Sequence, residues 1–372
     1  MSSILETGDG LFGTHVHLED VNLVIKEQMK TESRLLEDSE MTVIGDGNGF
    51  CSKVILINCH WSIPESHLPQ KLVLKIASFV HIQAMIENSK QEGVMLMSKE
   101  EQVQTMQYLK LAALKVHNQE LNFYDIIKEG KSESLLAPKV YFYQRFSDEN
   151  QTKGFIGMEF VEQSTARHTY QNCTREELQP ILKAIAHIQA LTFSISDDEV
   201  KKIEDGVISE QTSTTMLKEP AIKGILQHTR NIEKELLAGK VDQVEERYSE
   251  ILNLEKLFNL NTIVGIPKKV FVHGDLWAAN TLWTPEGHVC KILDYQLAHT
   301  GNPVEDLVRL MVTTLSGADR QKFWEEILDE FYDRLLEAMG NKDAPYTLEQ
   351  VSFWICGKFE ITRFLGSSNT YI

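Results

Sequence analysis

The stretch FVHGDLWAANTLW at residues 271–283, followed by KILDYQLA at 291–298, holds the most informative spacing in this 372-residue chain. His273-Gly-Asp275 comes first, Asn280 follows at D-x(4)-N spacing, and Asp294 lies in the second segment. Apolar residues flank Pro285-Glu-Gly287, which predicts two strands joined by a hairpin turn. The hairpin is expected to return Asp294 to the end of the sheet at which Asn280 lies.

These side chains suit phosphoryl transfer. A carboxylate orients the attacking hydroxyl and accepts its proton, and oxygen ligands hold Mg²⁺ against the phosphates. Alternation along the second strand is expected to turn Asp294 to the face of Cys290 and Ile292. The simpler interpretation of HGD is a turn in which Asp275 caps backbone N–H groups. The coincidence of D-x(4)-N with two apolar strands favours the catalytic interpretation.

The same motifs resemble those of the choline kinase-like and ecdysteroid kinase-like (CHK kinase-like) family, within the aminoglycoside phosphotransferase, protein kinase-like superfamily. The matching features are HGDLWxxN, the DYQ that begins at Asp294, and Asp306 in the following helix, and the similarity extends over nearly the whole chain. The resemblance implies that Asp275 is the catalytic base and that Asn280 and Asp294 hold Mg²⁺. It also implies that His273 and Asp306 support the loop, although Asp306 also fits an exposed acid in the first turn of a helix.

An ion pair is expected in the N-terminal half, where Lys75 lies inside the apolar strand KLVLKIA. Glu120 shares a helical face with Val116, Phe123 and Ile127, and both charges are costly to bury without a partner. A Lys75–Glu120 pair would satisfy both and would hold the α- and β-phosphates of ATP. A lysine that extends to solvent beside a glutamate at the rim is the other interpretation. Glu100 or Glu101 is the alternative partner.

A glycine-rich stretch, Gly45-Asp-Gly47-Asn-Gly49-Phe-Cys-Ser52, lies between two predicted strands. Its glycines would let backbone N–H groups approach phosphates, although an ordinary hairpin turn has the same composition. It is neither a Walker A loop nor a Rossmann fingerprint. By resemblance, Glu159 and Val161 fall where the family contacts adenine, and a plain strand end fits them equally.

The predicted fold class is α+β, a bilobal protein kinase-like fold with a small β-rich N-terminal lobe and a larger helical C-terminal lobe. Residues 1–161 form the nucleotide-binding lobe in this prediction, and residues 162–372 form the catalytic and acceptor-binding lobe. Helices are expected at 14–30, from Ser98 to about residue 128, from a Thr174 cap to Leu191, and twice within 218–260. Others are expected at 303–315, at 319–339 opened by Asp319, and at 347–364.

Composition limits the classes of binding partner and the cellular compartment that are expected for this protein. The net charge of −17 disfavours nucleic acid and anionic membranes, and no apolar run is long enough to span a bilayer. The N-terminus has no secretory pattern, and the five cysteines are scattered, which together predict a cytoplasmic protein. The oligomeric state stays open.

The predicted activity is ATP- and Mg²⁺-dependent transfer of the γ-phosphate to a small-molecule hydroxyl. The segment between Asp294 and Asp306 is too short for a long peptide-docking loop, which disfavours a protein substrate. Trp277, Tyr295 and Trp354 are the candidates for the acceptor pocket, although the face of Trp354 also fits a packed core. A sterol-like alcohol is slightly preferred to choline or ethanolamine. A catalytically silent kinase-like binding or scaffold protein is the alternative.

Overall fold

The computed structural model divides the chain into two compact units. The first comprises Met1–Ser132 and Ala137–Ser164, and the second comprises Glu133–Leu136 and Thr165–Ile372. The structure describes residues 3–45, 51–81, 99–127, 134–204, 219–232, 234–251, 259–266, 268–340, 342–352 and 355.

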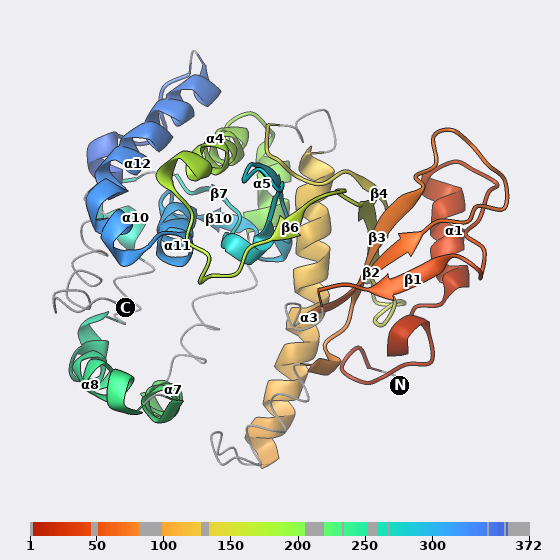
Figure 1. Cartoon of the computed structure of the whole chain (residues 1–372), viewed down its shortest axis with the longest axis horizontal. Coiled ribbons are helices and arrows are strands. Elements are labelled where there is room, and N and C mark those ends of the chain that lie inside the picture. The colour runs from red at the N-terminus through yellow and green to blue at the C-terminus, as the bar shows by residue number, and fades with distance from the viewer. Residues whose placement is uncertain are drawn as a thin grey trace. The chain divides into compact units, whose positions relative to one another are not determined.

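The first unit is built on a five-stranded antiparallel sheet of order β1-β2-β3-β5-β4 (Figure 1). Its strands are β1 (Glu40–Val43), β2 (Ser52–Asn58), β3 (Lys71–Ala77), β4 (Val140–Gln144) and β5 (Phe155–Glu159). Strand β3 lies at the centre, between β2 and β5, so a charge on it is enclosed by neighbours on both sides.

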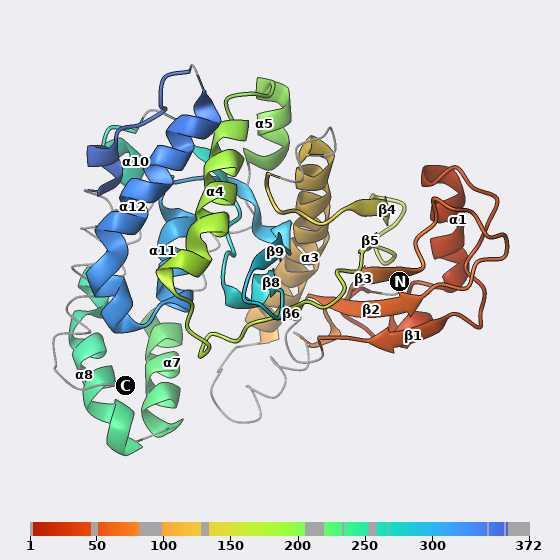
Figure 2. The same cartoon turned by 45° about the horizontal axis from the view of Figure 1, so that its top comes forward.

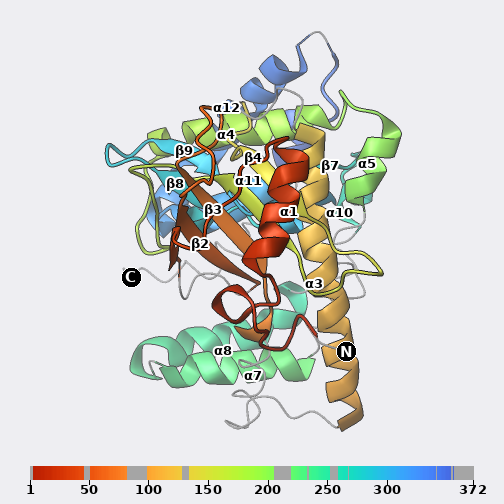
Figure 3. The same cartoon turned by 90° about the vertical axis from the view of Figure 1, so that its right-hand side faces the viewer.

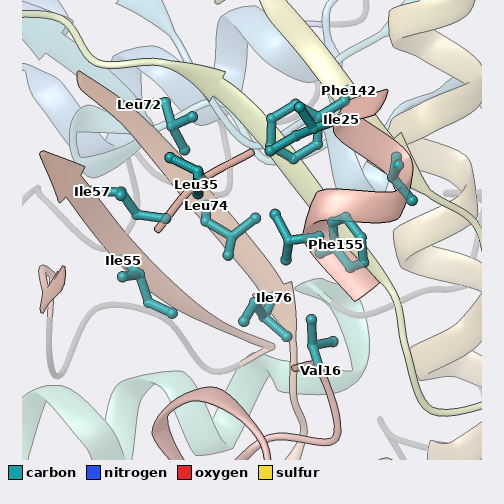
Figure 4. Packing of buried hydrophobic residues seen from close by; sticks show 12 residues of the cluster. Val16, Ile25, Leu35, Ile55, Ile57, Leu72, Leu74, Ile76, Phe142 and Phe155 are labelled. Atoms are coloured by element: carbon teal, nitrogen blue, oxygen red, sulfur yellow. The ribbon is translucent and has the colours of Figure 1, made fainter. Parts of the chain in front are cut away.

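One face of the sheet is covered by helix α1 (Leu18–Gln28) (Figure 3). The residues that alternate inward along β3, Leu72, Leu74 and Ile76, are fully buried and pack in one cluster with Ile25 of α1 (Figure 4). Because successive side chains on a strand point to opposite faces, Val73 and Lys75 lie on the other face of the sheet. The helix expected at 14–30 is confirmed, with Val21, Val24 and Ile25 buried and Met29 half-buried against the same cluster.

Helix α3 (Lys99–Ile127) is the long helix of the first unit. Its last turns bury Val116, Glu120, Phe123 and Ile127, the face that the sequence predicts. The predicted start of this helix, Ser98, lies outside the described residues.

Short strands surround residues 273–280, here called the HGD loop, in the second unit. β7 (Val270–Val272) pairs with β10 (His299–Gly301) (Figure 1). β8 (Thr281–Trp283) forms a hairpin with β9 (Val289–Ile292) (Figure 2). β6 (Thr165–Ala166) adds to the outer side of β8. The hairpin that the sequence predicts around Pro285–Gly287 is therefore confirmed.

Helices make up most of the described part of the second unit. They are α4 (Arg175–Leu191), α5 (Asp197–Glu204), α7 (Glu219–Ile232), α8 (Lys234–Ile251), α10 (Leu260–Ile263), α11 (Glu305–Thr314) and α12 (Gly317–Met339). α4 and α12 lie side by side, and Arg175 of α4 pairs with Glu326 and Glu330 of α12 (Figure 2). The predicted fold class is confirmed, since an antiparallel five-stranded sheet is followed by a mostly helical region.

The ends of two helices test the capping predictions. Thr174 caps α4 by accepting a hydrogen bond from the backbone N–H of Glu177, as predicted. The prediction that Asp319 opens α12 is wrong, because Ser316 is the cap and its hydroxyl accepts from the N–H of Asp319. The cap is the residue three positions before the N–H that it accepts from, and Ser316 occupies that position relative to Asp319. Thr347 and Gln350 cap each other at the start of the last predicted helix, most of which lies outside the described residues.

Four residues, Glu133–Leu136, group with the second unit although the chain on both sides of them belongs to the first. The backbone N–H of Ile292 donates to the carbonyl of Leu136, and the hydroxyl of Tyr295 donates to that of Leu135. The second unit is therefore discontinuous in sequence.

Within the described part of the chain, no helix is both long enough and apolar enough to cross a lipid bilayer.

Candidate active site

The loop between β7 and β8 is locked by the imidazole of His273, which is fully buried. The backbone N–H of Asp275 donates to Nδ1 of His273 over 3.2 Å. Nδ1 is therefore an acceptor, so Nε2 carries the hydrogen and donates to the carbonyl of Leu293 over 2.9 Å. One neutral side chain thus ties the loop to the chain that leaves β9.

Asn280 forms the second tie within this loop. It is 9% exposed, and its amide Nδ2 donates to the backbone carbonyl of Asp275 over 2.8 Å and to carboxylate Oδ2 over 3.1 Å. The carbonyl of Asn280 accepts from the backbone N–H of Leu293 over 2.8 Å. Because the amide nitrogen faces Asp275, the amide oxygen is the atom with which Asn280 can coordinate a cation.

The carboxylate of Asp275 lies among charges of both signs. Its side chain is 16% exposed, and Oδ1 forms an ion pair with the guanidinium of Arg309. Burial raises the pKa of Asp275, Arg309 opposes that rise, and the charge of Asp294 adds to it. A carboxylate whose proton affinity is raised is suited to accept a proton from a hydroxyl.

Asp294 lies two residues beyond β9, in the left-handed conformation with φ 68° and ψ 60°. The prediction that strand alternation turns it to the face of Cys290 and Ile292 is therefore wrong, since the strand has ended before it. Left-handed backbone is unfavourable for most residues with a side chain, and aspartate is one of the few that adopt it. Its charge acts on Asp275 from this position.

Asp306 supports the loop from the first turn of α11. It is fully buried, and its two carboxylate oxygens accept from the backbone N–H groups of His273 and Gly274, over 2.7 Å and 3.0 Å. This excludes the interpretation of Asp306 as an exposed helix acid. Burial raises its pKa to about 7, and the two N–H donors act in the opposite direction.

The glycine of HGD is required by a close approach. Gly274 has φ 78°, and a Cβ at this position would lie 2.3 Å from the carbonyl oxygen of Leu297. Any side chain would separate the loop from the turn that follows Asp294.

Lys75 and Glu120 form the predicted ion pair in the first unit. Nζ of Lys75 lies 2.7 Å from Oε2 of Glu120, and the two side chains are 14% and 2% exposed. The hydroxyl of Tyr124, one turn further along α3, donates to the other carboxylate oxygen over 3.3 Å. The interpretation of a lysine that extends to solvent is excluded.

The glycine-rich stretch connects β1 to β2. Gly45 has φ 70°, and no atom of the described residues lies within 4 Å of a Cβ placed there. Ser52 begins β2 opposite Ala77. Gly47 and Gly49 lie outside the described residues. Their contact with phosphate stays a prediction.

Glu159 ends β5, where its carboxylate accepts from the backbone N–H of Lys139 over 2.8 Å. The carbonyl of Val161 accepts from the hydroxyl of Ser164. Both residues are half-buried, and their contact with adenine stays a prediction.

The three candidates for the acceptor pocket have different outcomes. Trp277 is half-buried in the HGD loop. Tyr295 is fully buried, with its ring against His273 and its hydroxyl on the carbonyl of Leu135, so it packs beneath the loop and does not line a surface. Trp354 lies outside the described residues.

Arg309 is the site residue that the sequence reasoning missed. It lies one turn after Asp306 on α11, so both side chains project toward the same loop. That i, i+3 spacing from the bracing aspartate is the signal that could have identified it.

A G-x-G-x-x-G pattern at Gly8, Gly10 and Gly13 has the spacing of a dinucleotide fingerprint, and the structure explains it without a ligand. The N–H groups of Gly8 and Gly10 donate to the carbonyls of Gly13 and Thr14. A Cβ on either glycine would lie 2.3 Å from a carbonyl oxygen of residues 14–16. The described residues before it, 3–7, form a turn and no strand, so the segment is not the strand-turn-helix of a dinucleotide site.

The described residues contain no group of three or more His, Cys, Asp or Glu side chains that could hold a metal ion. Mg²⁺ in phosphotransfer sites keeps water and phosphate oxygens and takes only one or two protein carboxylates. One carboxylate, Asp294, and one amide oxygen, Asn280, fit that ion.

Three solved structures that this chain resembles share little of its sequence. Choline kinase of Cryptosporidium parvum is 13% identical, with a TM-score of 0.49 over 91% of this chain and 86% of that chain. APH(2″), solved as a GDP and kanamycin complex, is 13% identical, with a TM-score of 0.46 over 94% and 99%. The choline kinase LicA of Streptococcus pneumoniae is 13% identical, with a TM-score of 0.40 over 93% and 100%.

Among curated proteins, "Uncharacterized oxidoreductase dhs-27" of Caenorhabditis elegans is 22% identical over 299 residues. The match covers 77% of this chain and 34% of that protein, so the chain spans about a third of its relative's length. The model of the family DUF1679, described as "Uncharacterized oxidoreductase dhs-27", matches residues 4–354. This chain belongs to the DUF1679 family.

Proposed function

We propose that this protein is a phosphotransferase that uses Mg·ATP to phosphorylate the hydroxyl of a small molecule. The observation that carries the proposal is the position of Asp275. It is held by His273 and Asn280 and braced through Asp306, and Asp294 lies near enough for its charge to act on it. The likeness to choline kinase and aminoglycoside phosphotransferase structures agrees with this activity.

Each charged residue has a part in the proposed reaction. Asp275 orients the acceptor hydroxyl and takes its proton as the oxygen attacks the γ-phosphorus, and ADP leaves with the bond that breaks. Bound Mg²⁺, held by Asn280 and Asp294, would neutralise phosphate charge. Lys75, kept in place by Glu120, contacts the α- and β-phosphates.

The acceptor is proposed to be an apolar alcohol of sterol-like character in preference to choline or ethanolamine. The choice rests on the aromatic content of the candidate region, Trp277 and Trp354 in particular, and on the lack of an acidic cluster in the sequence of the last predicted helix. The protein kinase alternative is disfavoured by the short segment between Asp294 and Asp306.

The name oxidoreductase, carried by the family model and by the nematode relative, has no support from the dinucleotide-like pattern of this chain. The N–H groups of Gly8 and Gly10 are already bonded to backbone carbonyls. A catalytically silent binding protein is the remaining alternative, and it is disfavoured because Lys75, Asp275 and Asp294 are all present.

The test is nucleotide binding followed by turnover. Mg·ATP at about 100 times its Kd should stabilise the protein by about 2.7 kcal/mol in thermal unfolding. Asp294→Ala should abolish the Mg²⁺-dependent part of nucleotide binding in calorimetry, and Asn280→Ala should weaken it. A screen of small alcohols for γ-phosphate transfer then identifies the acceptor. A protein that Mg·ATP does not stabilise would exclude the proposal, and stabilisation without ATP turnover would favour the silent alternative.

A further inference from the structure

Arg309 brings a permanent positive charge to the site. Its guanidinium forms an ion pair with Oδ1 of Asp275, the oxygen that Asn280 does not contact. The side chain of Arg309 is 46% exposed, so it borders the solvent from which an acceptor would enter. An arginine side chain is not deprotonated in proteins.

Helix α11 therefore contacts the loop twice. Asp306, one turn before, fixes the backbone of residues 273 and 274, and Arg309 reaches the carboxylate itself. Because Asp306 is fully buried and holds α11 against the loop, the guanidinium has a defined place beside Asp275.

A hydroxyl that reaches Asp275 must approach within a few ångströms of this guanidinium. A cationic group two methylenes from the hydroxyl would then be repelled by Arg309. Two like charges about 6 Å apart, at the effective dielectric near a protein surface, repel strongly enough to change affinity by about tenfold or more, even after partial screening by Asp275. A neutral or anionic substituent is free of this repulsion.

We propose that Arg309 is a specificity-determining residue that excludes alcohols with a positive charge near the reacting hydroxyl, so the acceptor is neutral or anionic in that region. The proposal rests on the proposed phosphotransferase function, because it assumes that Asp275 binds the acceptor hydroxyl. It names the electrostatic class of the acceptor, which the aromatic residues alone do not decide.

The experiment compares two alcohols of the same shape, choline and its neutral isostere 3,3-dimethylbutan-1-ol. Each carries nine equivalent methyl protons, so saturation-transfer NMR reports binding of both without any need for turnover. In the presence of Mg·ADP, the isostere should bind wild-type protein at least about tenfold more tightly than choline. Arg309→Gln should bring the two affinities to within about threefold, and Arg309→Lys should keep the preference.

Arg334→Gln is the matched control, because Arg334 is also a half-exposed helical arginine in an ion pair, with Glu337 on α12. It should keep the wild-type preference. Equal binding of both alcohols to wild type would overturn the proposal, as would an unchanged preference in Arg309→Gln or no binding of either alcohol to any variant. The proposed function fails separately, through the absence of Mg·ATP binding and turnover, so the two failures are distinguishable.

Discussion

Two ion pairs, one in each unit, differ in how visible they are in the sequence. Both side chains of the Lys75–Glu120 pair are shielded from solvent, and each residue interrupts an apolar pattern in the sequence. Asp275–Arg309 has one mostly buried member and one that is 46% exposed. Arg309 stands within the apolar run LVRLMV at 307–312, but it lies at a solvent-facing position of α11, where an arginine needs no partner. Because a buried charge is costly without a partner, a charged residue inside an apolar pattern predicts an ion pair, whereas an exposed charge predicts nothing. The following predictions test this difference, from the largest effect to the smallest.

Asp275→Asn should lower turnover by about 10²–10⁴, the usual contribution of a positioned general base. The amide has the same size as the carboxylate, so Mg·ATP binding and the thermal unfolding temperature should remain near those of wild type. Steady-state ATP turnover and calorimetry measure the two quantities. Unchanged turnover would remove Asp275 from the mechanism.

Lys75→Met should lower the free energy of unfolding by about 3 kcal/mol, because it leaves the carboxylate of Glu120 buried without its cation. The control lies on the same strand. Lys71 pairs with Glu162 over 2.8 Å with both side chains exposed, so Lys71→Met should cost less than about 1 kcal/mol. Equal losses in urea unfolding would contradict the comparison. A double-mutant cycle with Glu120→Gln should be strongly non-additive in turnover.

Asp306→Asn should change how stability depends on pH. Burial raises the pKa of Asp306 to about 7, so the folded state holds the proton more tightly than the unfolded state. The stability that this group contributes is therefore fully present below about pH 4 and is lost as pH rises through about 7. The variant lacks this titration. Its unfolding temperature relative to wild type should shift in its favour between about pH 5 and pH 8, by the equivalent of about 2–3 kcal/mol. A relative stability that does not vary with pH would show that Asp306 titrates as an ordinary aspartate.

Arg309→Gln should have the smallest effect on folding, below about 1 kcal/mol in urea unfolding, because one partner of the pair is solvated. The substitution should instead reduce the preference of the protein for the neutral alcohol over choline. A loss comparable with that of Lys75→Met would show that Arg309 is a structural residue and that the two pairs do not differ in kind.

Most of the fold could be predicted because periodic patterns identify strands and helices and cap residues mark their ends. Strand β3 has the predicted bounds, and α4 begins at its predicted cap. The errors arise where the chain leaves regular structure. Asp294 follows a strand that has already ended, so alternation no longer fixes its direction, and α12 begins at Ser316 in preference to the charged Asp319.

Part of the site could be predicted for the same reasons. Asp275, Asn280 and Asp306 come together because their motif encodes a local loop and a nearby helix. The sequence predicts Tyr295 as a candidate for the acceptor pocket, yet its hydroxyl has a backbone acceptor at Leu135, which is distant in sequence and carries no pattern of its own. Contacts of this kind cannot be derived from spacing.

The excursion of residues 133–136 into the second unit has a consequence for synthesis. The carbonyls of Leu135 and Leu136 accept hydrogen bonds from the hydroxyl of Tyr295 and the N–H of Ile292. Because residues 135 and 136 leave the ribosome long before residues 292–295, the second unit cannot complete these hydrogen bonds until the later segment has emerged. Such sequence-distant pairings slow folding. They also mean that no single cut yields two intact halves. A fragment that begins at residue 162 lacks both carbonyls, and its Tyr295 hydroxyl is left buried without its acceptor.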